Sequence, residues 1–193
     1  VKAIESGNKV IPIYIWDEND SDLHTGSAGK WWLHQSLDRL SNRIEELGNK
    51  LVLRKGDPKS ILQEFISQNK VSKIFMNRRF EPQIIERDEG ILSQIDHEIT
   101  NGNLLFDPED IRTKQDKQYT VFTPFWKNCK MQTEPHEPLA IPSEIPAPDK
   151  FPESLSLDEM GLLPKIKWYE TFEKKWRPGE EEANRILVHF LKS

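Results

Sequence analysis

Polar and charged residues follow two apolar runs of the chain, and their types are those of a ligand site. Trp16 and Asp17 end the first run, and Lys30 comes a short loop and half a helical turn later. The second run leads into residues 77–81, Asn-Arg-Arg-Phe-Glu. If both runs are parallel strands, ligands bind beyond their carboxyl ends. An aromatic ring, a carboxylate, an amide and two guanidiniums could there line a cleft for a planar heterocycle with an anionic tail. The alternative is that these side chains are only solvated.

A further group of charges lies at the start of a predicted helix. Glu81, Arg87 and Asp88 are one or two helical turns apart, so they could pair along the helix surface. A salt-bridged helix start is the favoured interpretation, and a ligand-binding role is the alternative.

Residues 26–57 predict the unit that positions these groups. Apolar residues recur at the spacing of one helical face: Leu33, Leu37, Leu40, Ile44 and Leu47. Ser27 is expected to cap this helix and Gly48 to end it. The apolar run 51–53 then predicts a buried strand. Asp57 is expected to be the N-cap of the next helix, with Pro58 at its first position. Helix, strand and helix with tight joints are typical of a parallel α/β sheet.

The rest of the chain extends this pattern. We expect further strands at 10–16, 73–77 and 103–106, and helices at 58–69 and from Pro82 to about Asn101. The inward residues of the last helix would be Ile84, Ile85, Ile91, Leu92, Ile95 and Ile99. The predicted fold class is therefore α/β, a parallel Rossmann-like sheet flanked by helices.

Composition divides the chain into three parts. Residues 1–131 are expected to form the α/β domain. Residues 132–178 form a connector, in which dense prolines between 132 and 152 favour an extended rather than a packed chain. Residues 179–193 predict an amphipathic helix that begins a further domain, with these residues facing inward: Ala183, Ile186, Leu187, Phe190 and Leu191.

Charge and residue usage exclude several classes of protein. The net charge of −5 argues against a chain that grips nucleic acid over most of its surface. No apolar stretch approaches membrane-spanning length, and the single cysteine, Cys129, fits a reducing compartment, so we expect a cytoplasmic protein with no membrane contact. The five histidines lack zinc-ligand spacing, and no metal site is expected. A basic cluster could touch phosphate, although interleaved acidic residues favour a solvated face: Arg112, Lys114, Lys117, Lys127 and Lys130.

Several stretches together carry a family resemblance. They are residues 10–17, which contain the first predicted strand, AGKWWLHQSL at 28–37, residues 51–57, Phe-Glu-Pro at 80–82 with Glu-Arg-Asp at 86–88, and YTVFTPFWK at 119–127. In order and separation they resemble the N-terminal α/β domain of the DNA photolyase/cryptochrome family. The family's usual first strand is missing before Val1, and the chain stops before the family's helical domain, so the chain is expected to be a fragment.

The resemblance implies a division of labour. The α/β domain of the family can hold an antenna chromophore, a deazaflavin or a folate, which passes excitation to FAD in the helical domain. Carried over to this chain, the deazaflavin-type site would use Ile15, Trp16, Asp17, Lys30, Arg79, Glu81 and Arg87. A carboxylate that bonds folate in part of the family would fall near Gln83 and Ile84, and neither residue supplies one, which argues against a folate bound in that way.

These expectations lead to one favoured function and two alternatives. We expect part of a cyclobutane pyrimidine dimer photolyase, a monomer that acts on damaged DNA through its own C-terminal FAD-binding domain. Catalytic residues are not expected in the chain itself, which alone would be inactive. The alternatives are a cryptochrome-like blue-light photoreceptor and a non-catalytic nucleotide-binding or interaction domain.

Overall fold

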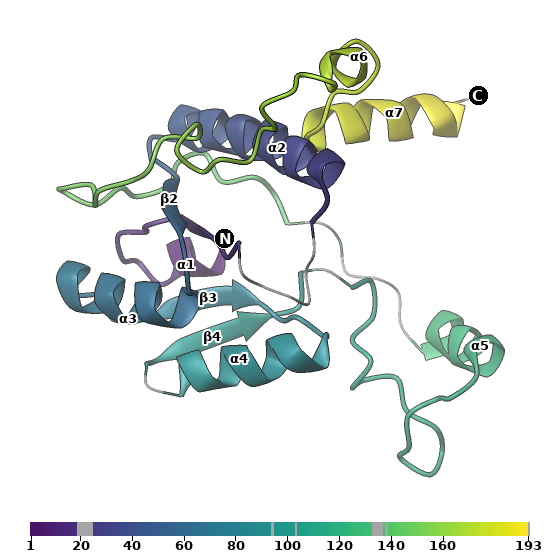
Figure 1. Ribbon diagram of the computed structural model, residues 1–193. Helices are drawn as coiled ribbons and strands as arrows, with labels where there is room; N and C mark the ends of the chain where they lie inside the picture. Colours follow the sequence, from purple (N-terminus) through teal and green to yellow (C-terminus); the bar gives the residue numbers. More distant parts are fainter. Residues whose placement is uncertain (19–24, 94, 103, 133–136, 138, 193) are drawn as a thin grey trace. The chain divides into compact units, whose positions relative to one another are not determined.

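The computed structural model describes residues 1–18, 25–93, 95–102, 104–132, 137 and 139–192. The chain forms two compact units (Figure 1). Unit 1 comprises residues 1–70 and 142–193, and unit 2 comprises residues 71–141. The loop expected between Asp17 and the helix that contains Lys30, and the strand predicted at 103–106, each fall partly outside the described residues.

A parallel strand pair forms the centre of unit 1. β1 (Ile13–Trp16) pairs in parallel with β2 (Val52–Lys55), and Ile13 lies opposite Val52. The strand begins just after Pro12, whose carbonyl accepts the Val52 N–H at 2.8 Å. The missing proline N–H therefore costs no hydrogen bond within the strand. The predicted parallel α/β architecture is confirmed for this pair.

Helices cover both faces of β2 (Figure 1). Side chains alternate across a strand, so Leu53 packs with Leu37 of α2 (Ser27–Glu46). On the other face, the Arg54 guanidinium lies 5.8 Å from the ring of Phe65 in α3 (Pro58–Asn69). The short helix α1 (Lys2–Glu5) precedes the strand pair.

The predicted boundaries of α2 are close to the observed ones, but the predicted cap was wrong. Gly26, which has no side chain, is the N-cap, because Ser27 is already the first helical residue. Gly48 adopts the left-handed conformation expected of a helix end, with φ of +81°. Leu40 lies on the apolar stripe and yet is 46% exposed, so the described residues of unit 1 do not cover the stripe along its whole length.

The start of α3 follows the prediction. Asp57 is the N-cap, and one of its carboxylate oxygens accepts the Ser60 N–H at 2.8 Å. Hydrogen bonds from the Ser60 hydroxyl and N–H lower the pKa of Asp57. A carboxylate with a depressed pKa in the folded state stabilises the fold above its unfolded pKa and loses this effect as the pH falls through the folded pKa.

We therefore expect Asp57→Ala to lower the free energy of unfolding by about 1 kcal/mol at neutral pH. The measurement is urea denaturation at pH 7 and at pH 3. The difference between variant and wild type should be smaller at pH 3 than at pH 7, because the stabilisation by Asp57 decreases as the pH falls towards its lowered pKa. Asp57→Asn is the control, because asparagine also caps helices and should retain most of the stability at both pH values. An equal loss in Asp57→Ala and Asp57→Asn would contradict a capping role.

Residues 142–162 are extended but firmly packed, which corrects the expectation of an unpacked connector. The Leu53 N–H and carbonyl point away from β1. The N–H donates to the Ser154 hydroxyl at 2.9 Å, and the carbonyl accepts the Leu155 N–H at 3.0 Å. This segment therefore covers the edge of β2 that β1 leaves free. Met160 and Leu162, 0% and 2% exposed, complete the core cluster with Leu37 and Leu53.

The side chain of buried Asn49 forms hydrogen bonds that hold the proline-rich part of the same segment against unit 1. Its side-chain amide donates to the Val10 carbonyl at 2.9 Å and lies 3.3 Å from the Pro146 carbonyl. The Val10 N–H donates to the same Pro146 carbonyl, and the Ile145 N–H donates to that of Leu47. Buried backbone groups need such partners, so residues 145 and 146 form part of unit 1.

The two C-terminal helices are α6 (Glu170–Glu173) and α7 (Glu180–Lys192). The prediction of a helix from about residue 179 is confirmed, and the packing of its apolar face into a further domain stays a prediction. In the described part of the chain, five apolar side chains of that face are exposed: Ala183, Ile186, Leu187, Phe190 and Leu191. No helix in the described part of the chain is long and apolar enough to cross a membrane.

Unit 2 contains a second parallel strand pair. β3 (Ile74–Asn77) and β4 (His97–Thr100) are joined by α4 (Pro82–Leu92). The prediction was wrong in continuing the helix to about residue 101 and in placing a strand at 103–106, of which the described part, 104–106, is not a strand. Ile91, Ile95 and Ile99 are spaced by four, which satisfies the helical period and also the period of two of a strand. A further helix, α5 (Phe122–Gln132), follows a turn in which Arg112 and Gln118 form an antiparallel bridge.

Candidate functional site

The carboxyl end of β1 brings an aromatic ring and a cation together. Lys30, in the first turn of α2, places its ammonium nitrogen 5.9 Å from the centre of the Trp16 ring. Both side chains are half-buried, as are Ile15 and Asp17 beside them. Among the described residues Lys30 has no carboxylate partner. The face of the indole attracts the ammonium group but does not neutralise it, so an anion could pair with Lys30.

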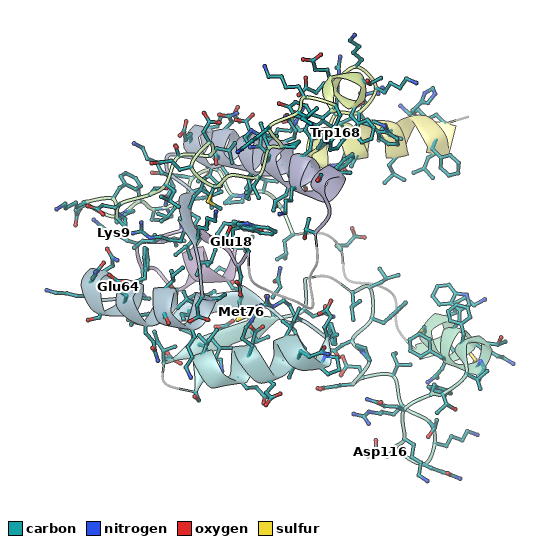
Figure 2. All side chains as sticks on the ribbon, viewed as in Figure 1. Lys9, Glu18, Glu64, Met76, Asp116 and Trp168 are labelled. Atoms are coloured by element: carbon teal, nitrogen blue, oxygen red, sulfur yellow. The ribbon has the colours of Figure 1, made fainter. Side chains whose placement is uncertain are left out.

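The backbone at this strand end is partly used by the fold. The Trp16 carbonyl accepts the Gly56 N–H at 2.9 Å. Lys55, opposite Trp16 in the strand register, pairs with Glu18 at 2.8 Å (Figure 2). The ring of Trp16 and the ammonium of Lys30 are therefore the groups best placed for a ligand in unit 1.

In unit 2, the guanidinium of Arg79 is already neutralised. Asp88 of α4 is 8% exposed and binds Arg79 through both of its oxygens, one of them 2.8 Å from the Arg79 Nε. The Nε of Arg87 lies 3.9 Å from the same carboxylate. A bidentate pair of this kind fixes both side chains. The favoured interpretation of these charges as a salt-bridged helix start agrees with this geometry.

The other charges at this end of β3 are also paired. Arg78 lies 3.0 Å from Glu109 and 3.7 Å from Asp107, and its pKa is raised, chiefly by the hydrogen bond with Glu109. Glu81 is the N-cap of α4, and its carboxylate accepts the N–H of Phe80 at 3.1 Å. Each strand end thus carries the expected side chains, and among the described residues at the two strand ends Lys30 is the cation for which no carboxylate partner is found.

The seven predicted site residues divide between the two units. Ile15, Trp16, Asp17 and Lys30 gather in unit 1, whereas Arg79, Glu81 and Arg87 gather in unit 2. Each group is local and consistent with a strand-end site. A single cleft formed by both groups stays a prediction.

Sequence reasoning missed a cleft on unit 1 that is lined by both polar and apolar side chains. It has a volume of about 360 Å³ and lies between the polar face of α2, the start of β2 and the segment that covers its edge. Its walls include Asp38, Ser41, Glu45, Lys50, Phe151 and Leu155. No sequence signal could have revealed it, because the segment around Phe151 had no predicted partner.

Parallel strands joined by helices, with charged side chains at the strand ends, define an α/β domain. The model of the family described as DNA photolyase matches residues 1–148, so the chain belongs to the DNA photolyase family. The resemblance inferred from the sequence motifs is thereby confirmed. Proteins of this family bind FAD and an antenna chromophore.

Individual relatives include both repair enzymes and photoreceptors. The chain is 37% identical to the deoxyribodipyrimidine photo-lyase of Agrobacterium fabrum, with 98% of this chain and 40% of that protein aligned. It is 27% identical to cryptochrome-2 of Arabidopsis thaliana over 94% of this chain and 32% of that one. The chain therefore spans two fifths or less of the length of these relatives.

A solved structure has the same fold. The crystal structure of a bacterial class III photolyase from Agrobacterium tumefaciens superposes with a TM-score of 0.90 at 35% sequence identity. The match covers all of this chain and 41% of that one. The predicted α/β fold class is thus confirmed by an experimental relative.

Proposed function

We propose that this chain is the antenna-binding part of a light-dependent DNA repair enzyme, a cyclobutane pyrimidine dimer photolyase. Family membership and 37% identity to a deoxyribodipyrimidine photo-lyase support this enzyme class. The observation that carries the antenna role is the Trp16–Lys30 pair at the carboxyl end of β1. When bound, the antenna absorbs light and passes excitation to FAD, which the remaining part of the parent protein would hold.

The residues of unit 1 fit a planar heterocycle with an anionic tail. The Trp16 ring offers an apolar face, and the Lys30 ammonium offers a positive charge beside it. Ile15 and Asp17 would contact the ring edge, and the family resemblance adds Arg79, Glu81 and Arg87, which belong to unit 2, as further ligand-binding residues. Ile84 is buried and cannot accept a hydrogen bond, so we favour a deazaflavin over a folate held by that helix.

The remaining features of the proposal concern the parent protein. Residues 1–131 would be the antenna domain, residues 132–178 the interdomain segment, and 179–193 the first helix of the FAD-binding domain. The parent would act as a cytoplasmic monomer on damaged DNA through that second domain. The 193-residue chain, which lacks it, would not repair dimers.

A cryptochrome-like photoreceptor is the alternative, because plant cryptochromes align with nearly the whole chain. The full-length parent should be reduced and illuminated with DNA that contains pyrimidine dimers. Loss of dimers supports repair, and unchanged dimers would favour the photoreceptor. Absorption bands of that protein beyond those of FAD would support an antenna in either case.

Lys30 gives a point test of the proposed site. We expect Lys30→Glu to weaken binding of a deazaflavin with an anionic side chain by about tenfold, or about 1.4 kcal/mol, because the charge that attracts the tail is reversed. Fluorescence titration of the chain measures this affinity. Lys59→Glu, at an exposed position of α3 in the same unit, is the matched control and should bind as the wild type does. Equal affinity of all three proteins would remove Lys30 from the site.

A further inference from the structure

The segment 111–131 of unit 2 is strongly basic, although the chain as a whole is acidic. It contains five basic residues and one acidic residue, a net charge of +4, whereas the whole chain carries −5. The five are the basic cluster noted in the sequence: Arg112, Lys114, Lys117, Lys127 and Lys130. Such a local excess attracts polyanions even when the protein as a whole does not.

One face of α5 combines exposed rings with a cation. Phe122 and Trp126 are one helical turn apart and stack in parallel, with ring centres 6.5 Å apart and planes inclined by 8°. Lys130, a further turn along, places its ammonium nitrogen 5.7 Å from the centre of the Trp126 ring. Phe122 is 71% exposed and Trp126 is 39% exposed. These residues are spaced by four, so they form one stripe along the helix.

The lysines of this region are not occupied by carboxylates. Among the described residues, no ion pair involves Lys114, Lys117, Lys127 or Lys130. The nearby acidic residues Asp107 and Glu109 are instead paired with Arg78. Asp110 and Asp116, the acidic residues interleaved with the basic cluster, also form no ion pair with these four lysines in the described part of the chain.

The turn before α5 is fixed relative to the helix. The Asn128 side chain of α5 donates to the Arg112 carbonyl at 3.1 Å. The Thr113 N–H donates to the Lys117 carbonyl at 2.8 Å, and Asp116 at the tip has a φ of +58° (Figure 2). Two lysines of the turn and two of the helix are thus presented by one local structure.

From this arrangement we propose that the α5 face, defined by Phe122, Trp126 and Lys130 with the adjoining lysines, binds single-stranded nucleic acid. Proteins that bind single strands without sequence preference combine aromatic stacking platforms with basic side chains along the backbone. Bases would stack on Phe122 and Trp126, and the lysines would pair with phosphates. A purely apolar protein partner would cover the rings but would leave the four cations without a function. This site shares no residue with the proposed antenna site.

The test uses the 193-residue chain and a fluorescein-labelled twelve-nucleotide oligothymidylate without lesions, followed by anisotropy in the dark. Binding should weaken about fiftyfold between 50 and 200 mM salt, because four neutralised phosphates give a slope of about −2.8 in a plot of log binding constant against log salt concentration.

The double variant Lys127→Ala/Lys130→Ala should halve this slope. Trp126→Ala should weaken binding about tenfold at 50 mM salt through lost stacking. The controls in unit 1 are Lys165→Ala/Lys167→Ala and Trp176→Ala, which alter exposed residues and should bind as the wild type does.

Three outcomes would overturn the proposal. They are no binding by the wild type at 50 mM salt, binding that is independent of salt, and wild-type affinity in Trp126→Ala. Sedimentation of the same samples covers the protein-partner alternative, since a Trp126→Ala effect confined to self-association would replace nucleic acid by a second copy. The assay contains no chromophore and no flavin, so its failure leaves the antenna proposal unaffected.

Discussion

Truncation of Met160 to alanine is expected to lower the free energy of unfolding of unit 1 by about 3 kcal/mol. The Met160 side chain is 0% exposed and packs in the cluster with Leu37, Leu53 and Leu162. Its removal loses apolar burial and leaves a cavity between α2 and β2, which well-packed surroundings fill only in part. Urea denaturation followed by tryptophan fluorescence measures the change, because buried Trp31 of α2 belongs to the same unit.

Met131 provides a control with the same side chain. It lies at the end of α5 in unit 2 and is 75% exposed, so Met131→Ala should change stability by less than about 0.5 kcal/mol. Similar small effects at both positions would mean that the segment around Met160 is not part of the core. A large effect of Met160→Ala alone would establish that a segment without any helix or strand helps to hold unit 1 together.

The packing of this segment, residues 142–162, could not be predicted from the sequence. α3 was predicted at its exact bounds, because Asp57 and Pro58 start a helix through contacts within a few residues. Residues 142–162 have no such local signal. Their hydrogen bonds to Leu47 and Leu53 join positions about a hundred residues apart, and composition alone suggested only an extended chain. β4 was misassigned for a related reason, since its pairing with β3 decides between two periods that the isoleucines satisfy equally.

At the candidate site, too, the sequence predicted what depends on neighbouring residues but not every contact that depends on how the elements pack. The sequence predicted which side chains follow the strand ends, because a strand followed by a polar turn is a local pattern. The contact of Lys30 with Trp16 requires α2 to pack beside β1, and the α/β pattern made that packing expected. The neutralisation of Arg79 by Asp88 depends on the angle at which α4 leaves β3, which no spacing rule gives. The sequence therefore predicted Arg79 as a possible ligand for an anionic tail but did not predict its pairing with Asp88.

Replacement of Asp88 by alanine is expected to destabilise unit 2 by about 2–3 kcal/mol. Asp88 is 8% exposed, and its loss leaves the Arg79 guanidinium without its bidentate partner. Breaking a buried pair from one side typically costs about 3–5 kcal/mol, and the side chain of Arg79 is 35% exposed, so water recovers part of that cost. Hydrogen exchange of amides in α4 and β3 reports the change for unit 2 separately from unit 1.

A double-mutant cycle with Arg79→Ala distinguishes the ion pair from simple loss of packing. The coupling energy should exceed about 1 kcal/mol if the two charges stabilise each other. Glu89→Ala, at the next and exposed position of α4, is the matched control and should have little effect. A coupling energy near zero would contradict the pairing.

The same Asp88→Ala variant also tests the proposed antenna site. If Arg79 contacts the anionic tail of the ligand, loss of its carboxylate partner should strengthen deazaflavin binding, although unit 2 becomes less stable. Stability and affinity would then change in opposite directions, which a purely structural role of Arg79 would not produce.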